Sequence, residues 1–154
     1  MNAKQKQLLK EAADALKIVD VALFGSRFAQ EHSLPKRKGA ELVQQHMEGW
    51  SSNMTKEREE RWLQVVCNFG VRLIKSNDSD DGREPHVYYT IEADFIAHYK
   101  LTDGELSDEA IETFVEFNAK HNVWPFWREY VFATCQRARI SPPEIGLYSR
   151  PASD

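Results

Sequence analysis

The chain has few cysteines. Cys67 and Cys135 are its only two, they are far apart, and each lies within an apolar pattern. Such a pair does not make the disulfide framework of a small secreted domain, so we expect two buried free thiols in a reducing compartment. The chain also has no apolar run long enough for a transmembrane helix, and its first seven residues lack the apolar core of a secretory signal. These absences predict a cytoplasmic protein with no membrane insertion.

An excess of positive charge is absent as well. The sequence has 20 Lys and Arg against 24 Asp and Glu, which gives a net charge of −4. A nucleic-acid-binding domain usually carries a basic face, so we expect no nucleic-acid partner and interpret the short run Lys36–Lys38 as a solvated loop. There is no nucleophile arrangement, no glycine-rich phosphate loop and no metal-ligand spacing among the 5 histidines. We therefore expect no enzyme activity, no metal and no cofactor.

Aromatic side chains, by contrast, are abundant. Of the 154 residues, 42% are hydrophobic and 11% are aromatic. This length and composition predict a single domain over residues 1–154 with its own hydrophobic core. The aromatic share exceeds what packing a small core needs, so we expect part of it at surfaces that contact other molecules.

The amino-terminal part begins with a helix and a strand. Residues 3–16 place leucine and alanine one helical turn apart with lysines opposite, which predicts a short amphipathic helix that docks on another element. Residues 18–29 change to an alternating apolar pattern, which predicts a strand largely covered on both faces. Gly25 within this strand indicates a bulge or a bend.

Residues 41–61 fit two structures. The charged, unbranched stretch Met54–Arg61 favours a helix by intrinsic propensity. The alternation of residues 42–50 fits a half-exposed strand equally well. The local sequence leaves both alternatives open.

Two long alternating segments follow. The odd-numbered residues from Leu63 to Leu73 are all apolar, and so are those from Val87 to Leu101, with the acidic stretch Asn77–Gly82 between them. This arrangement predicts an antiparallel hairpin with one buried face. We expect residues 18–101 as a whole to form an antiparallel sheet.

The helical period returns after residue 104. Ser107 is a predicted N-cap, with acidic residues in the first turn behind it. Pro125 is expected to push Trp124 out of the α conformation and to begin a new helix, and the prolines at 142 and 143 end it. We expect helices over residues 107–140 and a tail over 141–154. The fold class is therefore α+β, an antiparallel sheet with a Pro-interrupted helix packed on it.

Glu92 and Asp94 are the best candidates for chemistry. They lie two residues apart on one strand face, a spacing suited to paired acid–base carboxylates, although a solvated acidic stripe is the favoured interpretation. They support an alternative function, a small α+β ligand-binding domain or enzyme with a pocket between sheet and helix. A closed pocket around these carboxylates would favour that alternative. A plain interaction protein with one permanent partner is a third possibility.

Aromatic residues gather at 121–132. Phe126, Trp127, Tyr130 and Phe132 project in several directions around the predicted helix. One side can pack on the chain's own sheet, whereas the others need a neighbouring subunit or a ligand. We expect a subunit contact first and a peptide-binding surface second.

A specific signature surrounds the proline of this helix. Asn118 precedes Trp124-Pro125-Phe126-Trp127-Arg128-Glu129, and an apolar helix then runs to Arg137-Ala-Arg139-Ile-Ser-Pro-Pro. Strand residues 92–99 come before it, and the ending Pro142–Pro151 comes after it. This pattern resembles the SecB protein-export chaperones, and it is most similar to the SecB-like chaperones that accompany toxin–antitoxin systems.

The resemblance implies a fold and an activity. SecB-type subunits have a four-stranded antiparallel sheet with a long helix behind it, assemble as dimers of dimers, and hold unfolded polypeptide in long outer grooves without ATP. For this chain it implies a homotetramer, a second strand around residues 42–50, and a holdase whose client is a preprotein or an antitoxin. A site for a non-native chain needs exposed apolar surface and a strand edge, with little sequence preference.

One feature departs from the export members of the family. Those members dock the translocase motor SecA through acidic residues on the outer sheet face, whereas Asp20 is the only acid in the predicted first strand. Export with SecA as a partner is therefore one alternative, and a dedicated client such as an antitoxin is the other.

We predict three sets of functional residues. The predicted client groove comprises apolar residues in an otherwise polar segment: Leu42, Met47, Trp50 and Trp62. Helix packing and subunit contacts are assigned to Trp124, Phe126, Trp127 and Tyr130. The family motif comprises Asn118, Pro125, Arg128 and Glu129, of which Arg128 and Glu129 are expected to hold the helix through ion pairs.

Overall fold

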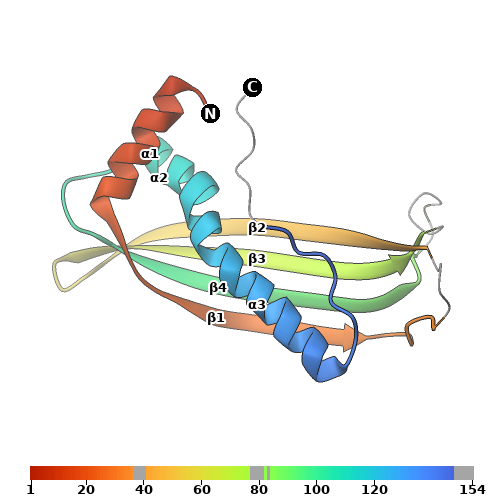
Figure 1. Cartoon of the computed structure of the whole chain (residues 1–154). Helices are drawn as coiled ribbons and strands as arrows, with labels where there is room; N and C mark the ends of the chain where they lie inside the picture. Colours follow the sequence, from red (N-terminus) through yellow and green to blue (C-terminus); the bar gives the residue numbers. More distant parts are fainter. Residues whose placement is uncertain (37–40, 77–81, 83, 148–154) are drawn as a thin grey trace.

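A four-stranded antiparallel sheet carries all the helices on one face and at one end. The computed structural model describes residues 1–36, 41–76, 82 and 84–147. The strands are β1 (Leu16–Gln30), β2 (Leu42–Glu57), β3 (Glu60–Lys75) and β4 (Val87–Leu101), and they lie in the order β1-β4-β3-β2. The longest helix crosses one face of the sheet diagonally, and the short helices α1 and α2 lie near one end of it (Figure 1). The expected α+β class and four-stranded sheet are confirmed.

The first helix, α1 (Ala3–Ala15), leads directly into β1. Asn2 forms a capping box with Gln5: the Asn2 side chain accepts from the Gln5 backbone N–H at 2.8 Å, and the Gln5 side chain accepts from the Asn2 N–H at 2.9 Å. Two orphan donors of the first turn are thereby satisfied. Leu9 and Ala12 of α1 are buried, and α1 packs mainly against α2 (Asp108–Phe114), so it docks on another element as its narrow apolar stripe predicted.

Residues 41–61 form strand rather than helix. β2 extends to Glu57 and pairs with β3 along its whole length, and the two central turn residues Arg58 and Glu59 have positive φ. A two-residue turn with positive φ at both positions matches the twist of a hairpin. The helical propensity of Met54–Arg61 is thus overridden, because strand pairing with the buried strand β3 satisfies the same backbone groups and helix propensities differ by only about 0.7 kcal/mol per residue.

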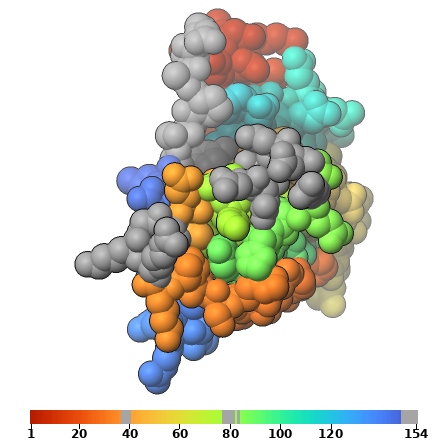
Figure 2. Space-filling model, turned by 90° about the vertical axis from the view of Figure 1, so that its right-hand side faces the viewer, coloured from red at the N-terminus to blue at the C-terminus, as the bar shows by residue number. Residues whose placement is uncertain are grey.

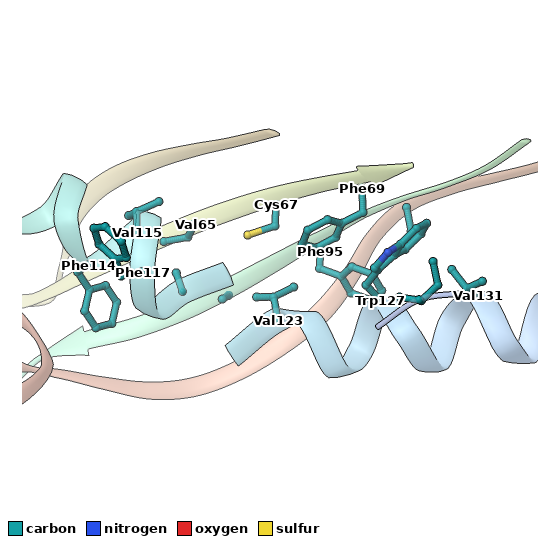
Figure 3. Packing of buried hydrophobic residues seen from close by; sticks show 14 of the residues in the cluster. Val65, Cys67, Phe69, Phe95, Phe114, Val115, Phe117, Val123, Trp127 and Val131 are labelled. Atoms are coloured by element: carbon teal, nitrogen blue, oxygen red, sulfur yellow. The ribbon is translucent and has the colours of Figure 1, made fainter. Parts of the chain in front are cut away.

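The sheet has two distinct faces. Paired residues of antiparallel strands point to the same side, so the buried residues Leu63, Val65, Cys67 and Phe69 of β3 define a helix-side face, and Gln64, Val66 and Asn68 define an outer face. In Figure 3, side chains from β3 and β4 meet Val123, Trp127 and Val131 of the long helix. The core therefore lies between the sheet and this helix.

The carboxyl-terminal helical run is continuous across Pro125. After the N-cap Ser107, whose side chain accepts from the Ala110 N–H, α2 passes through a π-helical turn, η2 (Val115–Ala119), into α3 (Lys120–Ala138). The expected break at Pro125 is wrong, because the proline lies inside α3 and Trp124 stays helical. Burial of Val123, Trp127 and Val131 on one face of α3 stabilises the helix enough to offset the missing N–H of an exposed proline near its start.

The first strand is much more exposed than its sequence suggested. The expected coverage on both faces is wrong for most of β1: Leu16 is buried, but five apolar residues are exposed to solvent, namely Ile18, Val19, Leu23, Phe24 and Phe28. The reason is its position, because β1 is an edge strand and α3 lies mainly over β3 and β4. The bulge expected at Gly25 is confirmed by the register shift between Leu23 and Gly25, and a second shift lies between Ile18 and Asp20.

Among the described residues, none of the helices is both long enough and apolar enough to cross a lipid bilayer.

Candidate functional site

A groove between β2 and α3 combines a strand edge with aromatic walls. β2 is the second edge strand, and a hollow of ≈ 130 Å³ beside it is lined by His46, Met47, Glu48, Gly70, Trp124 and Trp127. We call this the β2–α3 groove. The buried ring of Phe69 packs behind the two tryptophans of this lining, edge-on against Trp124 and stacked on Trp127. An edge strand offers unpaired backbone groups and aromatic rings offer apolar contact, so the groove has the two features that bind an extended polypeptide.

A buried lysine contacts Glu48, which lines this groove, and Trp50, which lies two residues further along β2. Lys120, at the start of α3, is 5% exposed, and its Nζ lies 3.5 Å from the centre of the Trp50 ring and 3.0 Å from Oε1 of Glu48. Trp50 and Glu48 are both helix-side residues of β2. The ammonium thus joins α3 to β2 by a cation–π contact and an ion pair, and it holds the Trp50 ring in a defined position. Trp50 is 45% exposed, so part of its surface remains open to solvent.

The four residues of the predicted client groove lie on two faces of the sheet. Leu42 and Trp50 pair with Lys75 and Cys67, which places them on the helix side. Met47 and Trp62 pair with Gly70 and Lys100, so their side chains point to the outer face. Leu42, Met47 and Trp50 are exposed and Trp62 is half-buried. The structure therefore brings Leu42 and Trp50 to one face and does not unite all four residues.

The four residues predicted for packing and subunit contact have different surroundings. Trp127 is buried in the chain's own core, and Trp124 and Tyr130 are half-buried. Phe126 is exposed, with its ring 6.4 Å from that of Phe95. Leu23 of β1 pairs with Phe95, so Phe126 lies on the same side of the sheet as Leu23, and the register places Ile18 and Phe28 on that side too. Phe126 and β1 together form an uncovered apolar surface.

One residue of the family motif, Arg128, contacts the segment that follows α3. Asn118 is half-buried in η2, and Pro125 and Glu129 are exposed. Arg128 donates from Nε to the carbonyl of Ile145 at 2.9 Å, and Trp124 donates from Nε1 to the carbonyl of Gly146 at 2.8 Å. The expected ion pairs of Arg128 and Glu129 are not found within the described part of the chain. The charged guanidinium of Arg128 instead donates to a backbone carbonyl. The sequence could not indicate this partner, because every residue has the same backbone carbonyl.

The predicted carboxylate pair lies outside the space between sheet and helix. Asp94 and Asn68 stand in one row across the sheet with Gly25 and Gly49, on the floor of a hollow of ≈ 550 Å³ on the outer face. Asn68 donates to Asp94 at 2.7 Å, and Arg27 lies 3.5 Å from Glu92. Both carboxylates thus have partners, and the space between sheet and helix that the enzyme alternative requires is filled by core side chains.

The thiol and tyrosine hydroxyl groups in the core are held in their neutral forms. Burial raises the pKa of the Cys67 thiol to about 12 and that of the Tyr99 hydroxyl to about 12. Tyr89 shows the same effect, with a pKa of about 12, and burial also raises the pKa of Cys135. A neutral, buried thiol is a poor nucleophile, so neither cysteine is suited to catalysis.

Three features of the site carried no clear sequence signal. The burial of Lys120 could have been suspected only from its place among apolar residues, and the exposure of β1 depends on which strand ends the sheet. The contact between Gln44 and the segment after α3 joins residues about a hundred positions apart, and no periodicity reports such a contact.

A known structure shares this fold. The SecB-like chaperone of Mycobacterium tuberculosis, solved in complex with a ChAD peptide from the HigA1 antitoxin, matches with a TM-score of 0.74 at 16% sequence identity. The match covers 95% of this chain and 99% of that chain. No family sequence model matches the chain, and no curated protein matches it in sequence. The predicted SecB-like fold is confirmed.

Proposed function

We propose that this chain is an ATP-independent chaperone that holds unfolded polypeptide, with the β2–α3 groove as its client site. The observation that carries the proposal is the edge strand β2 beside aromatic walls, with Trp50 presenting an exposed ring. A client segment in this groove would meet backbone groups from β2 and ring surfaces from α3, a mode with little sequence preference. The fold shared with a chaperone that binds an antitoxin peptide supports it.

Self-association belongs to the same proposal. The exposed apolar residues of β1 and the ring of Phe126 need a cover in water, and a second copy of β1 offers both the apolar residues and an unpaired strand edge. A dimer through β1 would leave the opposite edge, β2, free for clients. A dimer of such dimers gives the tetramer that the sequence resemblance implies.

The client is proposed to be a dedicated polypeptide such as an antitoxin, with an exported preprotein as the second candidate. Export would require docking of SecA on acidic residues of the outer face. Asp20 lies 2.7 Å from His98, and Glu92 and Asp94 are paired with Arg27 and Asn68. These acids are already engaged within the chain, which favours the dedicated client over export.

The test is suppression of aggregation without nucleotide. The purified chain should keep a chemically denatured client soluble after dilution, and Trp50→Ala should weaken client binding about tenfold or more, because buried aromatic anchors dominate such interfaces. Trp62→Ala is the matched control, since Trp62 is on the outer face. Equal weakening by both variants would move the client site away from the groove, and failure of the wild-type chain to hold any client would end the proposal.

A further inference from the structure

The segment after α3 lies in a site that is built to hold an extended peptide. We call residues 141–147 the tail segment. It leaves α3 through Arg139, which has a left-handed conformation, and returns beside β2 (Figure 1). Figure 2 shows the dark-blue tail segment next to the light-orange start of β2. The tail segment therefore runs along one end of the groove proposed for clients.

Side chains hold the backbone of this segment. The carboxamide of Gln44, oriented to satisfy both of its partners, accepts from the Glu144 N–H at 2.9 Å and donates to the Glu144 carbonyl at 3.3 Å. Arg128 donates to the carbonyl of Ile145, and Trp124 donates to the carbonyl of Gly146. Three consecutive residues are thus held through backbone atoms, which every amino acid possesses except for the N–H that proline lacks. Residues 141–147 make no backbone-to-backbone hydrogen bond with the rest of the described chain.

One side chain anchors the segment. Ile145 is 5% exposed and belongs to the core cluster, whereas Leu147, two residues later, is 80% exposed. The site therefore combines a single apolar pocket with contacts to backbone atoms that tolerate any sequence. This is the combination that a site for non-native polypeptide requires, because such a client shares no sequence with the next one.

We propose that the tail segment is an internal occupant of the client site, and that an extended client segment with one apolar anchor displaces residues 144–146 from Gln44, Trp124 and Arg128. The inference rests on the proposed function and adds regulation to it. The tail segment is tethered to α3 by a few residues, so its effective concentration at the site is high and a client must compete with it. Release of the tail segment raises the affinity for clients.

The test compares full-length variants that differ only in the anchor. Ile145→Asp places a charge in the apolar pocket and releases the tail segment, whereas Leu147→Asp adds the same charge at an exposed position two residues away. The probes are a fluorescent peptide with the sequence of residues 141–147 and a reduced, carboxymethylated protein as unfolded client. If the tail segment is released in one molecule out of ten, Ile145→Asp should bind both probes about tenfold more tightly than wild type. Leu147→Asp should bind them as wild type does.

A second substitution identifies the site. Adding Arg128→Met to Ile145→Asp removes a donor to the bound backbone, so the gain in peptide affinity should be lost. If circular dichroism shows that Ile145→Asp is unfolded, Ile145→Ala replaces it, with the same direction expected. Unchanged affinity of the folded Ile145 variant for both probes overturns the inference.

The two probes separate this inference from the proposed function. Tight binding of the peptide by the Ile145 variant, with no binding of the unfolded protein by any variant, would leave the displaceable tail segment in place and reject the chaperone function. Equal binding of the unfolded protein by wild type and by the folded Ile145 variant would retain the chaperone function and reject the competition.

Discussion

Lys120 is a charged residue in a buried environment. A lysine side chain is seldom buried, because removing an ammonium group from water costs several kcal/mol unless it is paired. Here Glu48 neutralises the charge and the face of Trp50 stabilises it. The three side chains couple the start of α3 to β2, and Glu48 is also part of the lining of the β2–α3 groove.

Removal of the Glu48 carboxylate should therefore lower the stability of the folded chain. We expect Glu48→Ala to lower the free energy of unfolding by about 1–3 kcal/mol, because it leaves the ammonium of Lys120 buried without its partner. The measurement is urea denaturation followed by tryptophan fluorescence at a fixed protein concentration.

Glu60 supplies the matched control. The side chains of Glu48 and Glu60 are both 46% exposed, but the side chain of the lysine paired with Glu48 is 7% exposed and that of the lysine paired with Glu60 is 40% exposed. Glu60→Ala should cost less than about 1 kcal/mol, as exposed ion pairs do. Equal losses in the two variants would show that burial of Lys120 is not what makes Glu48 important.

At the scale of elements, β1 and α3 show how position in the fold overrides local sequence. The alternation in β1 suggested burial, but the strand ends the sheet and keeps its apolar residues in water. Pro125 suggested a break, but packing on one face of α3 maintains the helix through it. In both cases long-range contacts, rather than propensity, decide the outcome.

The exposed strand leads to a prediction about assembly. Leu23→Lys should shift the molecular mass in solution toward the monomer while leaving the fold intact, because it places a charge in the apolar surface proposed to bind a second copy. Mass is measured by light scattering over a range of concentrations, and fold by circular dichroism.

Met47→Lys controls for the added charge. Met47 is 55% exposed and Leu23 is 51% exposed, but Met47 lies on the outer face of the other edge strand. It should leave the mass unchanged. A wild-type chain that is monomeric at every concentration would contradict the assembly part of the proposal.

At the scale of the whole molecule, the core between sheet and helix controls how stability depends on pH. Cys67, Tyr89 and Tyr99 are buried, and each has a pKa of about 12 in the folded chain. The unfolded chain exposes the same groups, and a thiol there loses its proton near pH 9. Above that pH the unfolded state binds fewer protons than the folded state, so stability decreases as pH rises.

The chain should therefore be sensitive to alkali. We expect the free energy of unfolding to show no loss from these groups below about pH 8, and to fall between pH 9 and 12 by up to about 1.4 kcal/mol per pH unit for each such group. Cys67→Ala should make the slope shallower, although its overall stability is lower. Urea midpoints at a series of pH values measure the slope, and an identical slope in wild type and Cys67→Ala would contradict this origin.

Hydrophobic periodicity by itself determined much of the fold. The amphipathic amino-terminal helix, the hairpin of β3 and β4 and the N-cap at Ser107 follow from patterns that extend over neighbouring residues, because periods of about 2 and 3.6 residues record which face of an element is buried. The resemblance around Pro125 correctly indicated the SecB-like fold. Both kinds of information lie within short stretches of the chain.

Only the tertiary structure decided which surfaces remain open. It placed β1 and β2 at the edges, buried Trp127, separated Met47 and Trp62 from Leu42 and Trp50, and brought Gln44 to the backbone of Glu144. These features depend on contacts between residues distant in sequence, and especially on side chains that bond to backbone atoms. A backbone carbonyl is the same at every position, so the sequence carries no record of which one Arg128 or Trp124 will bind.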